Sequence, residues 1–291
     1  MSLVVAAIHD DDQITMVADT KISFFDRQGH ADEARTRSTY SAALPKILLL
    51  RPDLMVGVTG DDPDVAIKDL VAHRNDRPEA LLDHVVGLTS AGFVVATHSP
   101  ARLWTVDGGL IDERTQVGRA WSGDRSAYDL FRQKWLEWPP ETLDAPFLLA
   151  SSMQFLTSFD PVQTVGGFTL VASTHSDGFR FQPCTSFVGP SHLQLDSIRV
   201  SDGSTTLQMG IPSGGDPTTH RVHIIPGEDP TRGALAIFIP QSGLGLLFQH
   251  DRPWTAQRLA ASGQDELIAS VSERFGDTLV ESPPPRASPC E

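Results

Sequence analysis

The sequence predicts an α+β protein in which two stacked β-sheets lie between two layers of helices, a four-layer αββα sandwich. Short apolar runs bounded by turn residues, which are typical of strands, occur in pairs along the first two thirds of the chain. Two pairs of segments with apolar residues at helical spacing separate these runs. A chain of 291 residues, 40% of them apolar, is long enough to bury a large core. Strands in pairs alternating with helices in pairs favour sheets packed on each other and covered by helices.

The first 60 residues are predicted to form two strand pairs. Residues 3–8 and 13–18 are apolar runs separated by Asp10, Asp11 and Asp12, which supply turn chemistry. Residues 46–50 and 54–59 form the second pair, with a turn at residues 51–53 that contains a proline. The segment between the two pairs, residues 23–43, is polar and irregular. Two antiparallel hairpins are therefore expected.

Helices and further strands are expected to follow. Asp62 and Pro63 are suited to the cap and first position of a helix, and Pro78 begins a second helix that we expect to end at Gly92. The next predicted strands are residues 93–97, 102–106 and 117–121, and the next helices are residues 125–138 and 142–157. A hairpin of residues 168–173 and 179–182 completes the predicted sandwich.

The chain is predicted to divide into a core, an extension and a tail. Residues 1–182 contain the elements of the sandwich, and residues 183–280 form a strand-rich extension with a final helix within residues 255–275. Residues 281–291 are rich in proline and are expected to be disordered. No internal repeat is evident.

The composition argues against several classes of protein. With 23 Lys and Arg against 37 Asp and Glu, the formal net charge is −14, so a phosphate backbone would be repelled and no nucleic-acid partner is expected. Two cysteines cannot form a disulfide framework, which favours a reducing compartment. No apolar stretch reaches the length of a membrane span, and the first residues lack the positive region of a signal peptide. We therefore expect a cytoplasmic protein without a membrane partner.

The N-terminus carries a candidate nucleophile. Removal of Met1 would leave Ser2 with a hydroxyl beside a free α-amine, whose pKa of about 7.7–8.0 suits a base at neutral pH. Such a site requires a cation near the amine, a carboxylate that orients the cation, and a backbone N–H for the oxyanion. Asp19, Lys46 and Gly60 stand at the ends of the predicted strands and could supply these groups.

These residues resemble the proteasome β-subunit family, whose members are N-terminal-nucleophile hydrolases, including its simpler bacterial members. The resemblance covers roughly residues 2–182 and is carried by four segments: Ser2-Leu-Val-Val-Ala, Val17-Ala-Asp-Thr-Lys, Lys46-Ile-Leu-Leu and Val56-Gly-Val-Thr-Gly60. The separation of Lys46 and Gly60 by 14 residues is that of the family, whereas Ser2 and Asp19 lie one residue further apart than is usual. Ser122-Gly-Asp resembles the Ser-Gly-Ser loop of the family, and residues 164–167 resemble a further conserved landmark.

The resemblance implies a fold, an activity and a set of partners. It implies an amide- or peptide-bond hydrolase with Ser2 as nucleophile, Lys46 tuning the amine, Asp19 orienting Lys46, Gly60 in the oxyanion hole and Ser122 supporting the amine. Neither a metal nor an organic cofactor is required. It implies a peptide or small-amide substrate and a homo-oligomer formed through helix faces such as that of residues 125–138. An ATPase partner is left unspecified.

Two departures keep an alternative open. The nucleophile of the family is normally Thr, and the late Asp of the family has no match in register, because Asp160 is displaced. The alternative is a catalytically silent structural, sensor or binding subunit of the same fold. A third interpretation is a small-amide acylase, in which the extension reshapes the cleft.

Overall fold

The computed structural model describes residues 2–10, 12–21, 43–137, 144–159, 162, 164–188, 194–201, 204–210, 220–229, 231 and 233–281. Within these ranges the protein is an α+β structure of antiparallel sheets and five α-helices, as the sequence predicts. Three sheets have five strands each, and a fourth consists of one hairpin. The expected tail lies outside the described residues, apart from Glu281, as does nearly all of the polar segment 23–43.

The first sheet contains both ends of the predicted core. Its strand order is β10-β9-β2-β1-β8, and every neighbouring pair is antiparallel. The strands are β1 (Leu3–His9), β2 (Gln13–Ala18), β8 (Arg119–Gly123), β9 (Leu170–His175) and β10 (Gly178–Phe181). The central strands β1 and β2 are buried on both faces, which explains why they are nearly continuous apolar runs in the sequence.

The second sheet is an antiparallel meander in chain order, β3-β4-β5-β6-β7. Its strands are β3 (Ile47–Arg51), β4 (Leu54–Gly60), β5 (Ala91–His98), β6 (Ala101–Asp107) and β7 (Leu110–Glu113). Gly57 in β4 allows the two sheets to approach closely, because a Cβ atom at this position would lie 2.3 Å from Val4 Cγ1 of the first sheet. Val4, Met16, Met55 and other buried residues of both sheets form one core cluster.

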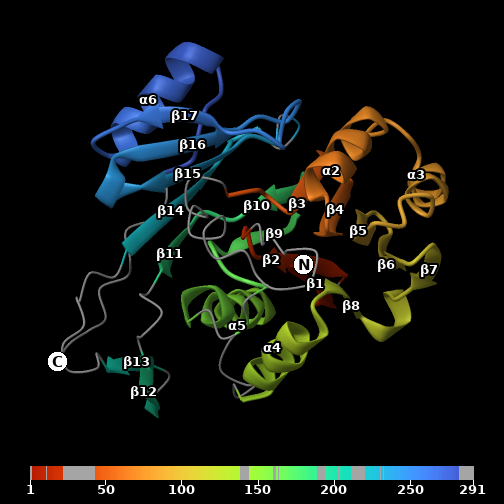
Figure 1. Cartoon of the computed structure of the whole chain (residues 1–291), viewed down its shortest axis with the longest axis horizontal. Coiled ribbons are helices and arrows are strands. Elements are labelled where there is room, and N and C mark those ends of the chain that lie inside the picture. The colour runs from red at the N-terminus through yellow and green to blue at the C-terminus, as the bar shows by residue number, and fades with distance from the viewer. Residues whose placement is uncertain are drawn as a thin grey trace, which may run out of the picture.

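Helices cover the outer face of each sheet (Figure 1). α4 (Arg125–Glu137) and α5 (Ala145–Phe159) pack against the first sheet, where Phe131 and Met153 are buried beside Leu3. α2 (Pro63–Ala72) and α3 (Pro78–Val85) pack against the second sheet, where Ile67 and Leu81 are buried. The apolar stripes seen in the sequence are therefore the faces that these helices bury.

A third sheet closes one side of the stacked pair. It has the order β11-β14-β15-β16-β17, with β11 (Cys184–Val188), β14 (His220–Pro226), β15 (Leu235–Ile239), β16 (Leu244–Phe248) and β17 (Gln257–Ala260). One face contributes Ile224, Ile237 and Phe248 to the core between the first two sheets. The other face packs on α6 (Gln264–Phe275) through Leu267 and Val271. The separate hairpin is β12 (Gln194–Ser201) and β13 (Ser204–Gly210).

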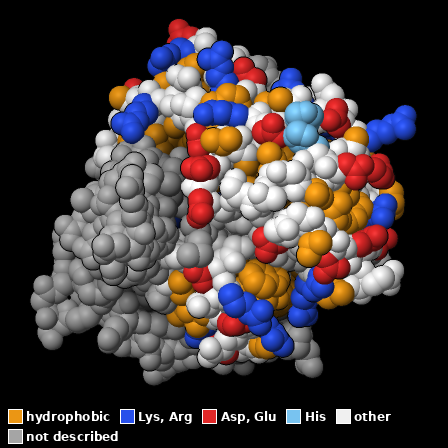
Figure 2. Space-filling model, turned by 45° about the vertical axis from the view of Figure 1, so that its right-hand side comes forward, with side chains coloured by type: hydrophobic (Ala, Val, Ile, Leu, Met, Phe, Trp, Pro, Cys, Tyr) orange, Lys and Arg blue, Asp and Glu red, His pale blue; other side chains and the backbone are white. Residues whose placement is uncertain are grey.

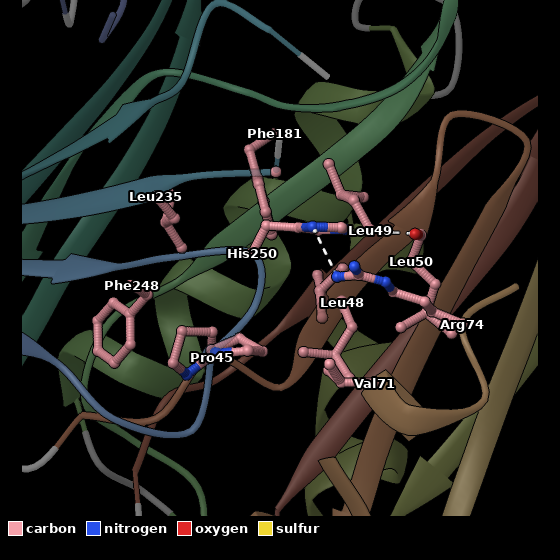
Figure 3. A pocket seen from close by; sticks show the side chains of 13 residues that line it. Pro45, Leu48, Leu49, Leu50, Val71, Arg74, Phe181, Leu235, Phe248 and His250 are labelled. Carbon is pink, nitrogen blue, oxygen red and sulfur yellow. Dashed lines mark hydrogen bonds between the residues drawn. The ribbon is translucent and has the colours of Figure 1, made fainter. Parts of the chain in front are cut away.

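The third sheet meets the edge strand β3 at a small pocket lined mainly by apolar side chains (Figure 3). His250, which follows β16, donates from Nε2 to the carbonyl of Leu50 at 3.3 Å and accepts from Arg74 at Nδ1 at 3.2 Å. Leu235 and Phe248 line the pocket from the third sheet. Both ring nitrogens of His250 thus form hydrogen bonds that connect the extension to the core.

Three local expectations differ from the structure. Gly92 does not end a helix, since α3 ends at Val85 and Gly92 lies in β5. The strand β7 was not predicted, because all four of its residues are exposed and carry no alternating pattern. The final helix expected within residues 255–275 is present as α6, but it begins only at Gln264, because β17 occupies residues 257–260.

Candidate active site

The candidate site lies where the ends of five strands meet. β1 begins beside the end of β2, with Val4 paired to Ala18, and beside the end of β8, with Leu3 paired to Gly123. In the facing sheet β3 begins beside the end of β4. Antiparallel pairing thus brings residues 2, 19 and 122 to one end of the first sheet and residues 46 and 60 to one end of the second. The Lys46–Asp19 and Thr59–Ser122 hydrogen bonds join these two ends.

Asp19 is held in place by several hydrogen bonds to its carboxylate. Its side chain is fully buried and accepts four hydrogen bonds. The donors are Leu3 N at 3.0 Å to Oδ1, and Lys46 Nζ at 2.8 Å, Lys21 N at 3.2 Å and Gly166 N at 3.3 Å to Oδ2. A buried carboxylate with this many donors is held in one position, so it can orient Lys46.

Lys46 is also buried, with 1% of its side chain exposed, and its ammonium contacts Asp19 directly. A second hydrogen bond runs from Nζ to the carbonyl of Lys21 at 2.6 Å. Burial lowers the pKa of Lys46, while the charge of Asp19 and its hydrogen bond oppose that shift. An ammonium has three donors, and two are used among the described residues, so one remains for a further acceptor.

Ser2 lies directly before the residue whose N–H binds Asp19. It is 2% exposed, and its carbonyl accepts from Asp124 N at 2.8 Å. This backbone bond and the Leu3–Asp19 bond fix the peptide on either side of position 2. Within the described part of the chain, no hydrogen bond joins the Ser2 hydroxyl to Lys46. The structure therefore brings Lys46 and Asp19 into contact and places Ser2 next to the residue that binds Asp19.

Ser122 and Gly60 occupy the ends of β8 and β4. The Ser122 hydroxyl is hydrogen bonded to Thr59 Oγ1 at 2.6 Å, and Thr59 also donates to the carbonyl of Gly92 at 3.2 Å. Gly60 has φ of +125°, and a Cβ there would lie 2.5 Å from the carbonyl oxygen of Ser90, so only glycine fits. Thr59 was missed in the sequence, because its role depends on a contact between the two sheets.

The loop at residues 164–167 packs against the Asp19 strand end. The Gly166 carbonyl accepts from the amides of Thr20 and Lys21, at 3.3 and 3.1 Å, while its N–H reaches Asp19. Asp124 joins this loop to α4, because its carboxylate accepts from Thr164 Oγ1 at 2.7 Å and from the first N–H groups of the helix. The predicted landmark therefore serves as backbone support for the Asp19–Lys46 pair.

Comparison with known proteins yields no assignment: no protein-family model matches the chain, and no curated protein matches it significantly.

None of the helices in the described ranges has the length and apolar character that crossing a bilayer would require.

Proposed function

We propose that the chain is a proteasome-like N-terminal-nucleophile hydrolase that cleaves amide or peptide bonds with Ser2 after removal of Met1. The observation that carries the proposal is the buried Lys46–Asp19 pair, whose carboxylate is tied through Leu3 N–H to the beginning of β1. A buried ion pair is costly to maintain, and such pairs concentrate at functional sites. The stacking of two sheets between helix layers also supports the fold of this class.

In the proposed reaction the Ser2 hydroxyl oxygen attacks the carbonyl carbon of the substrate, and the α-amine of Ser2 accepts the hydroxyl proton. The oxyanion receives a hydrogen bond from Gly60 N–H. The C–N bond then breaks, the leaving amine takes the proton from the α-ammonium, and an ester on Ser2 remains. Water attacks that ester with the α-amine again acting as base, which releases the acid and restores Ser2. Neither step needs a metal or an organic cofactor.

The donor of Lys46 that has no acceptor among the described residues supports this assignment. A cation beside the α-amine disfavours its protonated form and so lowers its pKa toward neutral pH. Asp19 keeps Lys46 charged in spite of its burial, because its charge and hydrogen bond raise the pKa that burial lowers. We therefore expect the rate of hydrolysis to rise with pH through a pKa at or below the ordinary α-amine range of about 7.7–8.0.

The proposal includes a homo-oligomer formed through the α4–α5 layer. Leu136 on α4 is 67% exposed and Phe147 on α5 is 47% exposed. Large apolar side chains exposed on one helix layer are suited to an interface with a second copy. A monomeric mass by light scattering at micromolar concentration would contradict this part of the proposal and leave the proposed chemistry open.

Intact-mass analysis and substitution test the nucleophile. We expect a chain that begins at Ser2 and reacts at its N-terminus with electrophiles selective for N-terminal nucleophiles. Ser2→Ala should lower hydrolysis at least about 10³-fold, because the attacking oxygen is lost, whereas Ser2→Thr should retain activity. Lys46→Arg should not retain hydrolysis, because a planar guanidinium does not replace a compact ammonium in a closed site. Lys68→Arg, on an exposed part of α2, is the matched control.

A catalytically silent subunit is the second candidate, and one observation favours it. The Ser122 hydroxyl, which would support the amine, is hydrogen bonded to Thr59 instead. A silent subunit would retain Met1 or resist acylation, and diverse peptides and small amides would not be cleaved. Hydrolysis that persists unchanged in Ser2→Ala would overturn the nucleophile assignment itself.

A further inference from the structure

Two histidines and one carboxylate gather on the outer helices of the second sheet. Asp69 and His73 lie one helical turn apart on α2 and at its C-terminal end, and His84 lies on α3. One ligand atom from each of the three residues lies within 4.8 Å of the other two. Figure 2, in which the right-hand side of Figure 1 is turned toward the viewer, shows one exposed patch of histidine side chains with acidic side chains beside it. The sequence did not indicate this group, because His84 joins it only through the packing of α3 on α2.

The contacts within the group position the ligand atoms. His73 Nδ1 donates to the backbone carbonyl of Asp69 at 3.0 Å, so its Nε2 carries the lone pair. His84 Nε2 is hydrogen bonded to Asp69 Oδ2. The two imidazole rings are stacked, with centroids 3.7 Å apart and planes inclined by 26°. An imidazole whose second nitrogen is bound to a backbone carbonyl is the arrangement that metal-binding histidines commonly have.

We propose that Asp69, His73 and His84 form a binding site for a first-row transition cation such as Zn²⁺. Imidazole and carboxylate are ligands suited to this class of ion, and side chains four residues apart on a helix commonly bind Zn²⁺ together. The cation would bind between His84 Nε2 and Asp69 Oδ2 in place of the proton between them, and His84 would bind as the neutral ring with its proton on Nδ1. His73 Nε2 supplies the third ligand, and water completes the shell.

Binding requires the three side chains to adjust. Bond lengths of about 2.0–2.2 Å to each ligand place neighbouring ligand atoms roughly 3.3 Å apart, so the hydrogen-bonded Asp69 and His84 must separate. The stacked rings of His73 and His84 must also tilt so that their lone pairs converge on the ion. All three side chains are about one third exposed, at 32–35%, so they are free to adjust and the site is open to solvent. Occupation would add a metal-mediated link between α2 and α3 to the Asp69–His84 hydrogen bond, the stacked rings and the apolar contacts above the second sheet.

Equilibrium dialysis of the full chain against Zn²⁺, with Co²⁺ absorption as the spectroscopic readout, tests the site. We expect one bound ion per chain, ligand-field bands typical of nitrogen and oxygen ligands, and a higher Tm in the presence of Zn²⁺. His73→Gln, His84→Gln and Asp69→Asn should each weaken binding by at least about tenfold. Each keeps a polar side chain at a partly exposed position, so the fold should survive, which circular dichroism checks.

His175→Gln is the matched control, since this exposed histidine lies on β9 and should leave binding unchanged. Absence of stoichiometric binding would overturn the proposal. So would binding that persists in both His73→Gln and His84→Gln, or that weakens equally in the control. These results are independent of hydrolysis, so the proposed enzyme and the metal site can fail separately.

Discussion

Removal of Asp19 should cost more stability than removal of Lys46, although the two side chains form one ion pair. Asp19→Ala leaves an ammonium that is 1% exposed without its counter-charge. Removal of one partner of a buried pair typically costs about 3–5 kcal/mol. Three backbone N–H groups, of Leu3, Lys21 and Gly166, lose their acceptor at the same time. We therefore expect a loss at the upper end of that range, about 5 kcal/mol.

Lys46→Met removes the charge but leaves Asp19 with its three backbone donors. The variant then loses two hydrogen bonds of the ammonium, to Asp19 and to the Lys21 carbonyl. At the lower end of the range of about 1.5–3 kcal/mol for each such bond, the loss is about 3 kcal/mol, and the methionine fills most of the space. In the double variant Asp19→Ala/Lys46→Met the buried ammonium is absent, so it should be more stable than Asp19→Ala alone.

Urea unfolding followed by circular dichroism measures these differences. Asp64→Ala, which breaks the exposed Lys68–Asp64 pair, is the control and should change the free energy of unfolding by no more than about 0.5 kcal/mol. Equal losses in Asp19→Ala and Lys46→Met, or a loss below about 1 kcal/mol in Asp19→Ala, would refute the reasoning. The measurement does not depend on whether the protein is an enzyme.

Three further predictions concern other parts of the chain. Gly123→Ala should be strongly destabilising, because φ is +115° and a Cβ would lie 1.9 Å from the carbonyl oxygen of Ser2; thermal unfolding measures it. Burial lowers the pKa of His250, so its contribution to stability should be complete above the unfolded value of about 6.5 and decline as pH falls toward the lowered folded value, with a shallower decline in His250→Gln. Burial raises the pKa of the Cys184 thiol to about 12, so peptide-resolved alkylation at neutral pH should modify it only after unfolding.

Each of these predictions has a contrary outcome. A Gly123→Ala variant as stable as Ser90→Ala, a substitution in an exposed turn, would show that β1 and β8 separate without cost. An unchanged pH profile in His250→Gln would assign the acid sensitivity to other histidines, such as His9, whose pKa burial also lowers. Rapid alkylation of the half-buried Cys184 in the folded protein would contradict the raised pKa of its thiol.

The sequence predicts the strands of the core well, because buried strands are apolar runs whose ends carry turn residues. The Asp19–Lys46 contact is expected from the resemblance to the proteasome β-subunit family. The two residues stand at the ends of strands in different sheets, so strand pairing alone does not bring them together. The Thr59–Ser122 contact could not be predicted, since it joins residues 63 positions apart across two sheets. The position of His84 beside Asp69 likewise depends on how two helices pack, which local patterns do not encode.

The third sheet, which closes one side of the stacked pair, delays completion of the core during folding. Val4 and Phe248 belong to the same core cluster, so the apolar interior is incomplete until the last third of the chain has been synthesised. Contacts of such long sequence separation form slowly, because the entropy of closing a long loop must be lost before the contacts stabilise anything. On the ribosome, the strands of residues 1–182 would expose Ile47, Leu49 and Phe181 to solvent until β15 and β16 emerge. During this interval a chaperone could bind the exposed apolar side chains.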